Sequence, residues 1–302
     1  MNRAAGRGQR AKRVLVIYKK SAYQIYVRER RHPRIEQLLA AHEPAALRLL
    51  RAHEHHMKAI EAAREVLASL GADAKFRHRS DDAHAQHVDL VVTLGGDGTL
   101  LWGAHLVGRD IPIVAINTAP RDSVGYFCAG TRRDLREVLG KALHGELPVT
   151  RLARMQVALD GRVLSNRVLN DALFCHECPA STARYRLQLG RLVEEHKSSG
   201  VWVGPPAGSS AAQRSAGGDL LPEEDRVLQY VVREAYDPTS VRYRLRKGLV
   251  QARQVLRLTS LMRAGRLYLD GPHNVQTIEM ASRIEFRVSD EPLLLLGFKR
   301  PP

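Results

Sequence analysis

One short segment, Gly95 to Thr99 (GGDGT), concentrates residue types that could do chemistry. The apolar run before it, Val88 to Leu94, predicts a buried parallel strand, and the segment from about Thr99 predicts a helix. Glycines at a strand-to-helix turn leave backbone N–H groups open to an anion. A lone carboxylate among such groups suits a base that accepts the proton of an attacking hydroxyl. The segment therefore predicts phosphoryl transfer to an alcohol, with Asp97 as the base.

The predicted phosphate contacts are Gly95, Gly96, Gly98 and Thr99. The segment is not a Walker A loop, because no Gly-Lys-Ser/Thr follows the glycines. A turn-forming aspartate in a tight strand–helix connection is the alternative interpretation of Asp97.

The flanking sequence predicts an α/β domain with a parallel sheet. Arg13 to Tyr18 predicts its first strand, and Ile111 to Ile116 predicts another strand that ends at Asn117. In such a sheet the ligand lies at the carboxyl ends of the strands, where both Asn117 and the GGDG turn are placed. Between the strands a helix is expected over Leu47 to Leu70, with Gly71 as its C-terminal stop. Its predicted buried stripe is Leu50, Met57, Ile60, Val66, Leu67 and Leu70, and its predicted polar face includes His53, His55 and His56.

The sequence changes character near Pro148, where short alternating segments and turn signals begin. This pattern predicts a mostly antiparallel β domain over residues 149–302, after a basic tail at 1–12 and an α/β domain at 13–148. We expect the C-terminal segment to be able to pack back on the first domain. The expected strands are Met155–Leu159, Val163–Leu173, Tyr185–Leu189, Val201–Val203, Val255–Leu258, Arg266–Leu269, Ile284–Val288 and Leu293–Leu296. Turns are expected at Asp160-Gly161, Asp270-Gly271 and Tyr236-Asp237-Pro238, and alternating Arg242, Arg244 and Arg246 predict the solvent face of a strand.

Charge and composition narrow the class of protein. The net charge is +15, with basic residues scattered rather than interleaved with aromatic ones, so a field that gathers phosphorylated small molecules is favoured over nucleic-acid binding. No apolar run approaches the ~18 residues that span a bilayer, and no membrane partner is expected. The three cysteines, Cys128, Cys175 and Cys178, are too few for a disulfide scaffold and favour a reducing, cytoplasmic compartment. Cys175 and Cys178 form one CxxC without a second pair, so ordinary cysteines are favoured over a metal site.

The order of the motifs resembles the NAD kinase family, over most of the chain. GGDGT is shared with lipid kinases of the wider superfamily, and two later landmarks make the resemblance more specific. Asn170-Asp171 resembles an Asn-Glu pair that grips the ribose and adenine of the nucleotide. The second glycine-rich segment is matched by Lys197-Ser198-Ser199-Gly200, Ala207-Gly208-Ser209-Ser210-Ala211 and Ser215-Ala216-Gly217-Gly218.

The chain is similar to the mitochondrial-type subgroup and its bacterial relatives. This similarity rests on Lys20 and Tyr23 after the first strand, the His-rich helix, Asn117-Thr118-Ala119-Pro120 and Lys-Ser-Ser-Gly in place of Asp-Gly. The chain departs from the family pattern at Asp171, where the family has Glu, and at Ala207, which replaces a hydroxyl residue. It also has Ala212 where the family places an aromatic residue, followed by an unusual Gln213-Arg214.

The resemblance implies a two-domain fold and transfer of the γ-phosphate of ATP to the adenosine 2′-hydroxyl of NAD, making NADP. It implies Mg²⁺ with the ATP, no tightly bound cofactor or resident metal, and a homo-oligomer in the bacterial cytoplasm. It also implies a nucleotide site formed by Asn117, Asn170, Asp171, Lys197, Ser199, Ser209, Ser210, Ala211 and Ser215. The alternatives are a lipid or sphingoid-base kinase, since GGDGT is shared, and a catalytically weak nucleotide-binding protein, since Ala207, Ala212 and Gln213 are unusual.

Overall fold

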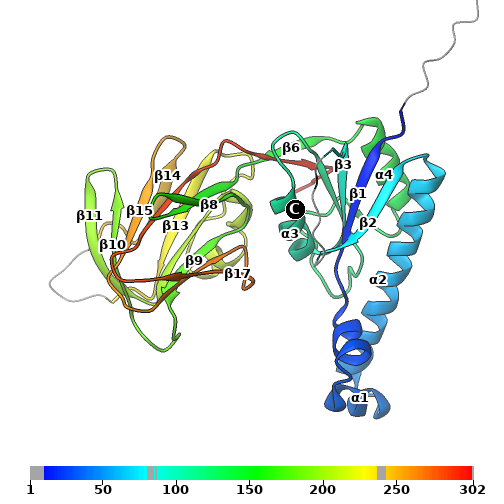
Figure 1. Cartoon of the computed structure of the whole chain (residues 1–302), viewed down its shortest axis with the longest axis horizontal. Coiled ribbons are helices and arrows are strands. Elements are labelled where there is room, and N and C mark those ends of the chain that lie inside the picture. Colours follow the sequence, from blue (N-terminus) through cyan, green and yellow to red (C-terminus); the bar gives the residue numbers. More distant parts are fainter. Residues whose placement is uncertain (1–9, 80–84, 86, 237–242, 301–302) are drawn as a thin grey trace, which may run out of the picture. The chain divides into compact units, whose positions relative to one another are not determined.

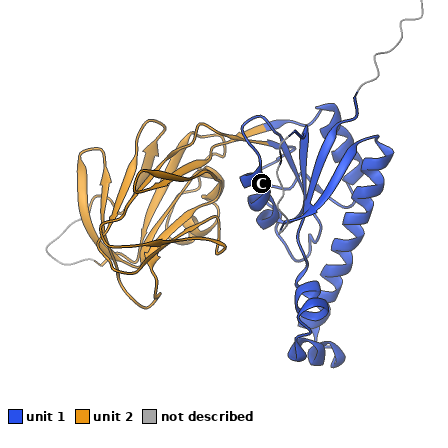
Figure 2. Ribbon diagram, in the orientation of Figure 1, with its two compact units in different colours: residues 1–149, 295–302 blue, residues 150–294 orange. Residues whose placement is uncertain are grey.

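A computed structural model of the chain describes residues 10–79, 85, 87–236 and 243–300. It divides into two compact units (Figure 2). Unit 1 comprises residues 1–149 and 295–302, and unit 2 comprises residues 150–294. The chain therefore crosses from one unit to the other twice.

Unit 1 is built on a sheet whose strand order is β2-β1-β3-β4-β19-β6, with β5 paired to β4. Figure 1 labels β1, β2 and β3 of this sheet. Strands β1 to β5 pair in parallel, as the sequence predicts, and β19 also runs parallel to β4. The strands are β1 (Arg13–Tyr18), β2 (Asp73–His78), β3 (Leu90–Gly95), β4 (Ile113–Asn117), β5 (Gly130–Thr131), β6 (Val149–Leu152) and β19 (Leu293–Leu296). The helices are η1 (Gln24–Glu29, a π-helix), α1 (Pro33–Ala40), α2 (Pro44–Ser69), α3 (Asp97–Leu106) and α4 (Leu135–His144).

Alternate residues of the central strands are buried under helices on opposite faces. Val14 and Val16 join one core cluster with Ile60 and Leu67 of α2 and Leu139 of α4. On the other face α3 packs closely, because a Cβ on Gly103 would lie 2.8 Å from the Thr93 side chain. Both faces of β3 and β4 are thereby covered, which explains why these strands read as continuous apolar runs.

The buried face of α2 differs from the predicted stripe. Met57 is 43% exposed, whereas His53 and His56, expected on a polar face, are buried. Their rings are hydrogen-bonded: His53 Nδ1 lies 2.8 Å from Ser21 Oγ, and His56 Nδ1 and Nε2 lie 2.9 Å from Thr118 Oγ1 and 2.7 Å from the Lys19 carbonyl. Burial lowers the pKa of both imidazoles, which favours their neutral forms. The polar-face prediction was wrong for these two because their partners come from segments far away in the sequence.

Unit 2 consists mainly of two antiparallel sheets, in the orders β11-β10-β15-β18-β7-β8 and β14-β13-β12-β9-β16-β17. One apolar cluster draws side chains from both sheets, including Val157, Phe174, Tyr185 and Phe286. The strands are β7 (Met155–Leu159), β8 (Arg162–Val168), β9 (Ala172–His176), β10 (Ala183–Leu189), β11 (Leu192–Ser198), β12 (Gly200–Gly204), β13 (Val227–Arg233), β14 (Lys247–Gln251), β15 (Leu256–Ser260), β16 (Gly265–Leu269), β17 (Asn274–Ile278) and β18 (Arg283–Val288). Two short helical turns, η2 (Pro206–Gly208) and α5 (Ala212–Ser215), follow β12.

Two strand predictions in unit 2 were wrong. The expected strand Val163–Leu173 is two strands in different sheets, because residues 169–171 turn their backbone N–H groups toward the Asp270 carboxylate. Arg244 and Arg246 precede β14 rather than forming a strand, and the backbone N–H of Arg244 donates to Glu194. Arg242, Asp237 and Pro238 lie outside the described residues.

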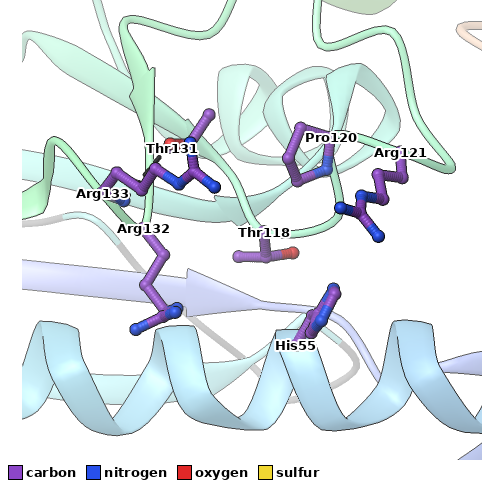
Figure 3. Close-up of a pocket in the computed structure, with 7 residues that line it drawn as sticks. All are labelled: His55, Thr118, Pro120, Arg121, Thr131, Arg132 and Arg133. Atoms are coloured by element: carbon purple, nitrogen blue, oxygen red, sulfur yellow. Dashed lines mark hydrogen bonds between the residues drawn. The ribbon is translucent and has the colours of Figure 1, made fainter.

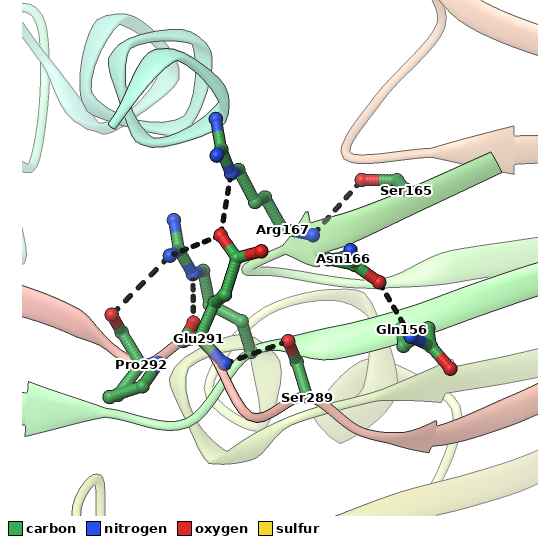
Figure 4. Close-up of polar contacts among 8 residues, drawn as sticks. Gln156, Ser165, Asn166, Arg167, Ser289, Glu291 and Pro292 are labelled. Atoms are coloured by element: carbon green, nitrogen blue, oxygen red, sulfur yellow. Dashed lines mark hydrogen bonds and ion pairs between the residues drawn. The ribbon is translucent and has the colours of Figure 1, made fainter. Parts of the chain in front are cut away.

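A buried arginine holds the segment that leads from β18 to β19, of which Figure 4 labels Ser289, Glu291 and Pro292. Arg154 is fully buried and donates to the carbonyl oxygens of Glu291 and Pro292. The Glu291 carboxylate also accepts a 2.9 Å hydrogen bond from Arg167. Burial lowers the pKa of Arg154 to about 10, and the neighbouring charge of Arg167 adds to the shift. The guanidinium therefore joins the beginning of β7 to the chain that returns toward unit 1.

Candidate functional site

The GGDG turn joins the end of β3 to α3, and its first two glycines are required by packing inside the chain. A Cβ on Gly95 would overlap the Thr99 side chain, and a Cβ on Gly96 would overlap Ser123 Oγ. Gly96 is the N-cap residue of α3, so Asp97 is the first residue of that helix. The turn thus places a carboxylate at the positive end of a helix dipole.

Asp97 is held by two backbone donors from the loop between β4 and β5. Tyr126 N–H donates to Oδ2 at 2.9 Å, and Phe127 N–H donates to Oδ1 at 3.0 Å. Each oxygen keeps a further lone pair for another partner. The carboxylate is therefore fixed in orientation while it can still accept a proton.

Gly98 and Thr99 differ from their neighbours. Gly98 has open space beside it, and the Thr99 hydroxyl has no hydrogen-bond partner among the described residues. No atom lies within 4 Å of a Cβ built on Gly98, so nothing in the described structure requires glycine there. Thr99 Oγ1 is buried and has no hydrogen-bond partner among the described residues. An orphaned buried hydroxyl is costly unless a ligand or water satisfies it, so both features suit an approaching phosphate.

Asn117 is paired in register with Gly95 at the ends of β4 and β3. Its side-chain amide donates to the Ser123 carbonyl at 3.0 Å and accepts from Ala119 N–H at 3.1 Å. Gly125 has a φ of +62°, and a Cβ there would overlap the Asn117 amide. Asn117 therefore shapes the loop that carries the two donors to Asp97, a positioning task that the sequence did not specify.

Sequence reasoning missed a basic pair at the same end of the sheet. Lys19 directly follows β1, Arg79 directly follows β2, and the Arg79 N–H donates to the Tyr18 carbonyl at 2.9 Å. Burial lowers the pKa of the Lys19 ammonium, and the charge of Arg79 lowers it further. A cation held in this way is stabilised by an anionic ligand. The sequence signal that could have identified this pair is a basic residue directly after each strand.

In unit 2 the Asp270 carboxylate organises the Asn170-Asp171 landmark. Its oxygens accept hydrogen bonds from the backbone N–H groups of Leu169, Asn170 and Asp171 at 2.8, 2.7 and 3.1 Å. Asp270 N–H in turn donates to the Asp171 carbonyl at 2.9 Å. The turn that the sequence marked as structural is thus the support on which this candidate binding pair is built.

Asp171 is buried beside this second carboxylate. Burial raises the pKa of Asp171 to about 7, and the charge of Asp270 adds to the shift. The Asn170 side-chain amide donates to Asp171 Oδ2 at 2.8 Å and fixes its orientation. The pair therefore presents a carboxyl whose ionisation changes near neutral pH.

The second glycine-rich segment lies against this pair. Gly204 and Gly208 both approach the Asn170 carbonyl so closely that a Cβ at either position would overlap it. Gln213, which the sequence marked only as unusual, is completely buried and donates to the same carbonyl at 3.5 Å. Gln229 donates to Gln213 Oε1 at 3.3 Å and continues the contact toward Asp219. Gln213 is therefore a positioning residue that sequence reasoning missed.

The remaining predicted residues of this segment are placed as follows. Ser209 is buried and its Oγ accepts from Leu221 N–H at 3.0 Å, whereas Ser215 is exposed on α5. Ser210, Ala211 and Ala212 are half-buried at the start of α5. The structure thus brings Ser209 to Ser215 into the same unit as Asn170 and Asp171, next to the Gly208 contact.

Lys197 and Ser199 lie apart from these contacts in the described structure. Lys197 is exposed on β11, where it pairs with Arg184 of β10. Ser199 lines a separate cavity of about 270 Å³ together with Arg233, Cys175, His176 and Tyr268. Cys175 and Cys178 are free cysteines, and Cys178 N–H donates to His176 Nδ1.

Metal clusters and membrane-spanning helices would indicate other classes of function. In the described part of the chain, no group of three or more His, Cys, Asp or Glu residues is arranged to hold a metal ion. The helices that the structure describes include none long and apolar enough to cross a membrane.

Comparisons with known proteins agree with this geometry. The family described as ATP-NAD kinase N-terminal domain matches residues 5–147. A probable NADH kinase of Oryza sativa subsp. japonica is 33% identical over 261 residues, covering 79% of this chain and 80% of the relative. This chain belongs to the NAD kinase family. As a member of that family it is a phosphotransferase, which decides against the lipid-kinase alternative.

Other members of the NAD kinase family show the same relationship. The NADH kinase of Arabidopsis thaliana is 29% identical over 262 residues, covering 79% of this chain and 82% of the relative. A crystal structure of an NAD kinase from Archaeoglobus fulgidus in complex with ATP has a TM-score of 0.64 and 18% identity, covering 95% of this chain and 94% of that one. This last likeness shows the fold, an α/β unit followed by a mostly antiparallel β unit.

Proposed function

We propose that this protein transfers the γ-phosphate of ATP to the adenosine 2′-hydroxyl of NAD or NADH. The Asp97 carboxylate takes the hydroxyl proton as the oxygen bonds to the γ-phosphorus. The bond from that phosphorus to the β–γ bridging oxygen breaks, and ADP leaves. Family membership and the names of the relatives support the substrates.

The proposal rests mainly on the geometry of the GGDGT turn. Asp97 is oriented by two backbone donors, Gly98 has open space beside it, and Thr99 Oγ1 is buried without a partner. A fixed base beside an unfilled polar position suits phosphoryl transfer, in which positioning and charge stabilisation supply most of the rate. Lys19 and Arg79 are the proposed cations for the triphosphate.

The acceptor contacts are proposed to come from Asn170 and Asp171. Asp171 in its ionised form accepts hydrogen bonds from ribose hydroxyls, and the Asn170 amide offers both a donor and an acceptor. Asp270 and Gln213 act through these two residues as positioning groups. Because Asp171 is one methylene shorter than the glutamate of the family pattern, its hold on the ribose depends strongly on this support.

Magnesium is proposed to enter with the triphosphate, as part of the substrate. The buried Thr99 hydroxyl, which has no hydrogen-bond partner among the described residues, is an oxygen that suits the hydrated ion or the phosphate it accompanies. When bound, the ion offsets the negative charge that develops on the phosphate oxygens. Residues of the chain keep the tasks of binding, orientation and proton removal.

The reduced dinucleotide is a specific second acceptor. Two relatives that align over most of their length, from rice and Arabidopsis, are named NADH kinases. In addition, Ala212 is half-buried where the family pattern has an aromatic residue on the nicotinamide side. We therefore propose that discrimination between the oxidised and reduced rings is decided near Ala212.

The testing experiment measures phosphorylation of NAD and of NADH with Mg-ATP, for the wild type and for Asp97→Asn. We expect wild-type turnover and a fall of about a thousandfold or more in kcat for Asp97→Asn, because the amide cannot accept the proton. Circular dichroism of both proteins serves as the folding control. Absence of turnover in a folded wild type, with calorimetric binding of NAD, would favour the binding-protein alternative instead.

Assembly and compartment are proposed from the family resemblance alone. We propose a homo-oligomer in the bacterial cytoplasm, and sedimentation velocity at several protein concentrations tests the first part.

A further inference from the structure

A basic cavity in unit 1 is lined by none of the residues placed in the candidate site above. Its volume is about 590 Å³, within the range of about 300–1,000 Å³ that is typical of small-molecule pockets. It is lined by His55, Thr118, Pro120, Arg121, Thr131, Arg132 and Arg133. Four of these seven residues carry basic side chains, and none is acidic.

Three elements contribute these side chains from different sides (Figure 3). His55 rises from α2, Arg121 projects from the loop after β4, and Arg132 extends from the end of β5 toward the same helix. Because the three come from separate elements, their side chains surround one space instead of lining one exposed helix face. Such an arrangement suits an anion with several charged oxygens.

Within residues 10–79, 85, 87–236 and 243–300, these guanidinium groups have no counter-ion. In the described structure, the guanidinium groups of Arg121, Arg132 and Arg133 make no ion pair and donate no hydrogen bond. Asp134, the acid nearest in sequence to Arg133, accepts from Thr131 N–H at 2.9 Å and from Thr131 Oγ1 at 3.0 Å. The three side chains are therefore available to an external ligand.

The framework of the cavity is held in place before any ligand binds. His56, next to His55, is buried and hydrogen-bonds Thr118 Oγ1 and the Lys19 carbonyl, which fixes α2 against the loop. Asn117 fixes the start of the same loop through Ser123 and Ala119. A preorganised framework reduces the ordering cost of binding.

We propose that this cavity is a second phosphate site, which binds a small molecule carrying a di- or triphosphate group. Guanidinium groups from two sides of the cavity, Arg121 on one and Arg132 and Arg133 on the other, suit a group with more than one phosphate, and the volume accommodates a nucleotide. Asp97, Gly98 and Thr99, the proposed donor position, are not among the residues that line it. Its ligand binds without chemistry, so the inference does not depend on the proposed kinase reaction.

Calorimetry with inorganic pyrophosphate tests the proposal, using the full chain free of nucleotide. A non-hydrolysable Mg-ATP analogue is added only afterwards, as a competitor. The Arg132→Ala/Arg133→Ala protein is compared with Arg109→Ala/Arg253→Ala, which removes the same charge from exposed positions outside the cavity. We expect pyrophosphate to bind the wild type and the control, and to bind the cavity variant at least about tenfold more weakly. GDP in the same titration distinguishes the sources: tighter binding than pyrophosphate identifies a nucleotide, and equal binding identifies the phosphates alone.

Three results would overturn the proposal. The first is no pyrophosphate binding to the wild type, and the second is equal weakening in the cavity and control variants, which would indicate general charge attraction. The third is displacement of pyrophosphate by the ATP analogue together with a raised KM for ATP in the cavity variant. That result would assign the cavity to the donor substrate.

Discussion

At the scale of single residues, two aspartates close together in unit 2 have opposite tasks. Asp270 is surrounded by three backbone N–H donors, which satisfy a negative charge. Asp171 is buried with one amide donor beside it and has a pKa raised to about 7. Asp270 thus holds the loop in place through its backbone contacts. Asp171, which is proposed to bind the acceptor, changes its protonation near neutral pH.

The raised pKa of Asp171 predicts how stability changes with pH. Its folded pKa of about 7 lies above the unfolded value of 3.8, so the neutral form favours folding and this contribution is lost as pH rises between those values. We expect Asp171→Asn, which cannot ionise, to become progressively more stable than the wild type from pH 4 to 7, and the difference to level off above pH 7. Thermal unfolding of both proteins at intervals across this range measures it, and a difference that stays constant with pH would contradict it.

Much of the candidate site could be predicted residue by residue, but its supporting groups could not. Asp97 and the Asn170-Asp171 pair are visible because their residue types and spacing are unusual. Asp270 supports that pair from about a hundred residues further along the chain, and His56 meets Thr118 in the same long-range way. Such partners are decided by tertiary structure, which a local pattern does not contain.

At the scale of elements, the turn from β3 to α3 combines glycines of two kinds. Gly95 is required because its neighbour Thr99 occupies the space of a Cβ, whereas Gly98 has open space. We expect Gly95→Ala to destabilise the protein by about 1–3 kcal/mol through overpacking. By contrast, Gly98→Ala is expected to keep or slightly increase stability, since alanine is the better helix former, while kcat/KM falls at least about tenfold because the methyl group fills ligand space.

Denaturation curves and initial rates of the two variants, measured side by side, separate these effects. Full activity in Gly98→Ala would show that the open space belongs to solvent and not to a ligand.

Local sequence patterns are insufficient to predict some boundaries and buried faces of the helices and strands. The apolar segment from Val163 to Leu173 reads as one strand, yet the chain changes sheets at Leu169 because the Asp270 carboxylate replaces a neighbouring strand as hydrogen-bond partner. On α2, alanines and hydrogen-bonded histidines occupy much of the buried face, so large apolar residues alone did not define it. Strands β3 and β4 were predictable because burial on both faces leaves an unambiguous apolar run.

At the scale of the whole molecule, the last strand belongs to the first sheet. Leu295 of β19 is fully buried and pairs with Ile113 of β4. We expect Leu295→Ala to destabilise unit 1 by about 2–5 kcal/mol, the usual cost of deleting a buried leucine side chain. Leu249→Ala, at a side chain that is 41% exposed, is the matched control and should change stability much less.

Hydrogen exchange of β3 and β4 amides reports the stability of unit 1 separately from unit 2. Equal protection of these amides in the two leucine variants would contradict the prediction.

The position of β19 has a consequence for how the protein is made. In the sheet order β19 lies between β4 and β6, but it is encoded after all of unit 2. During translation, β1 to β4 leave the ribosome well before their last parallel neighbour has been synthesised. The nascent α/β unit therefore has an open sheet edge at the beginning of β4, beside Ile113, until β19 has been synthesised, so termination before β19 would leave that edge exposed to aggregation.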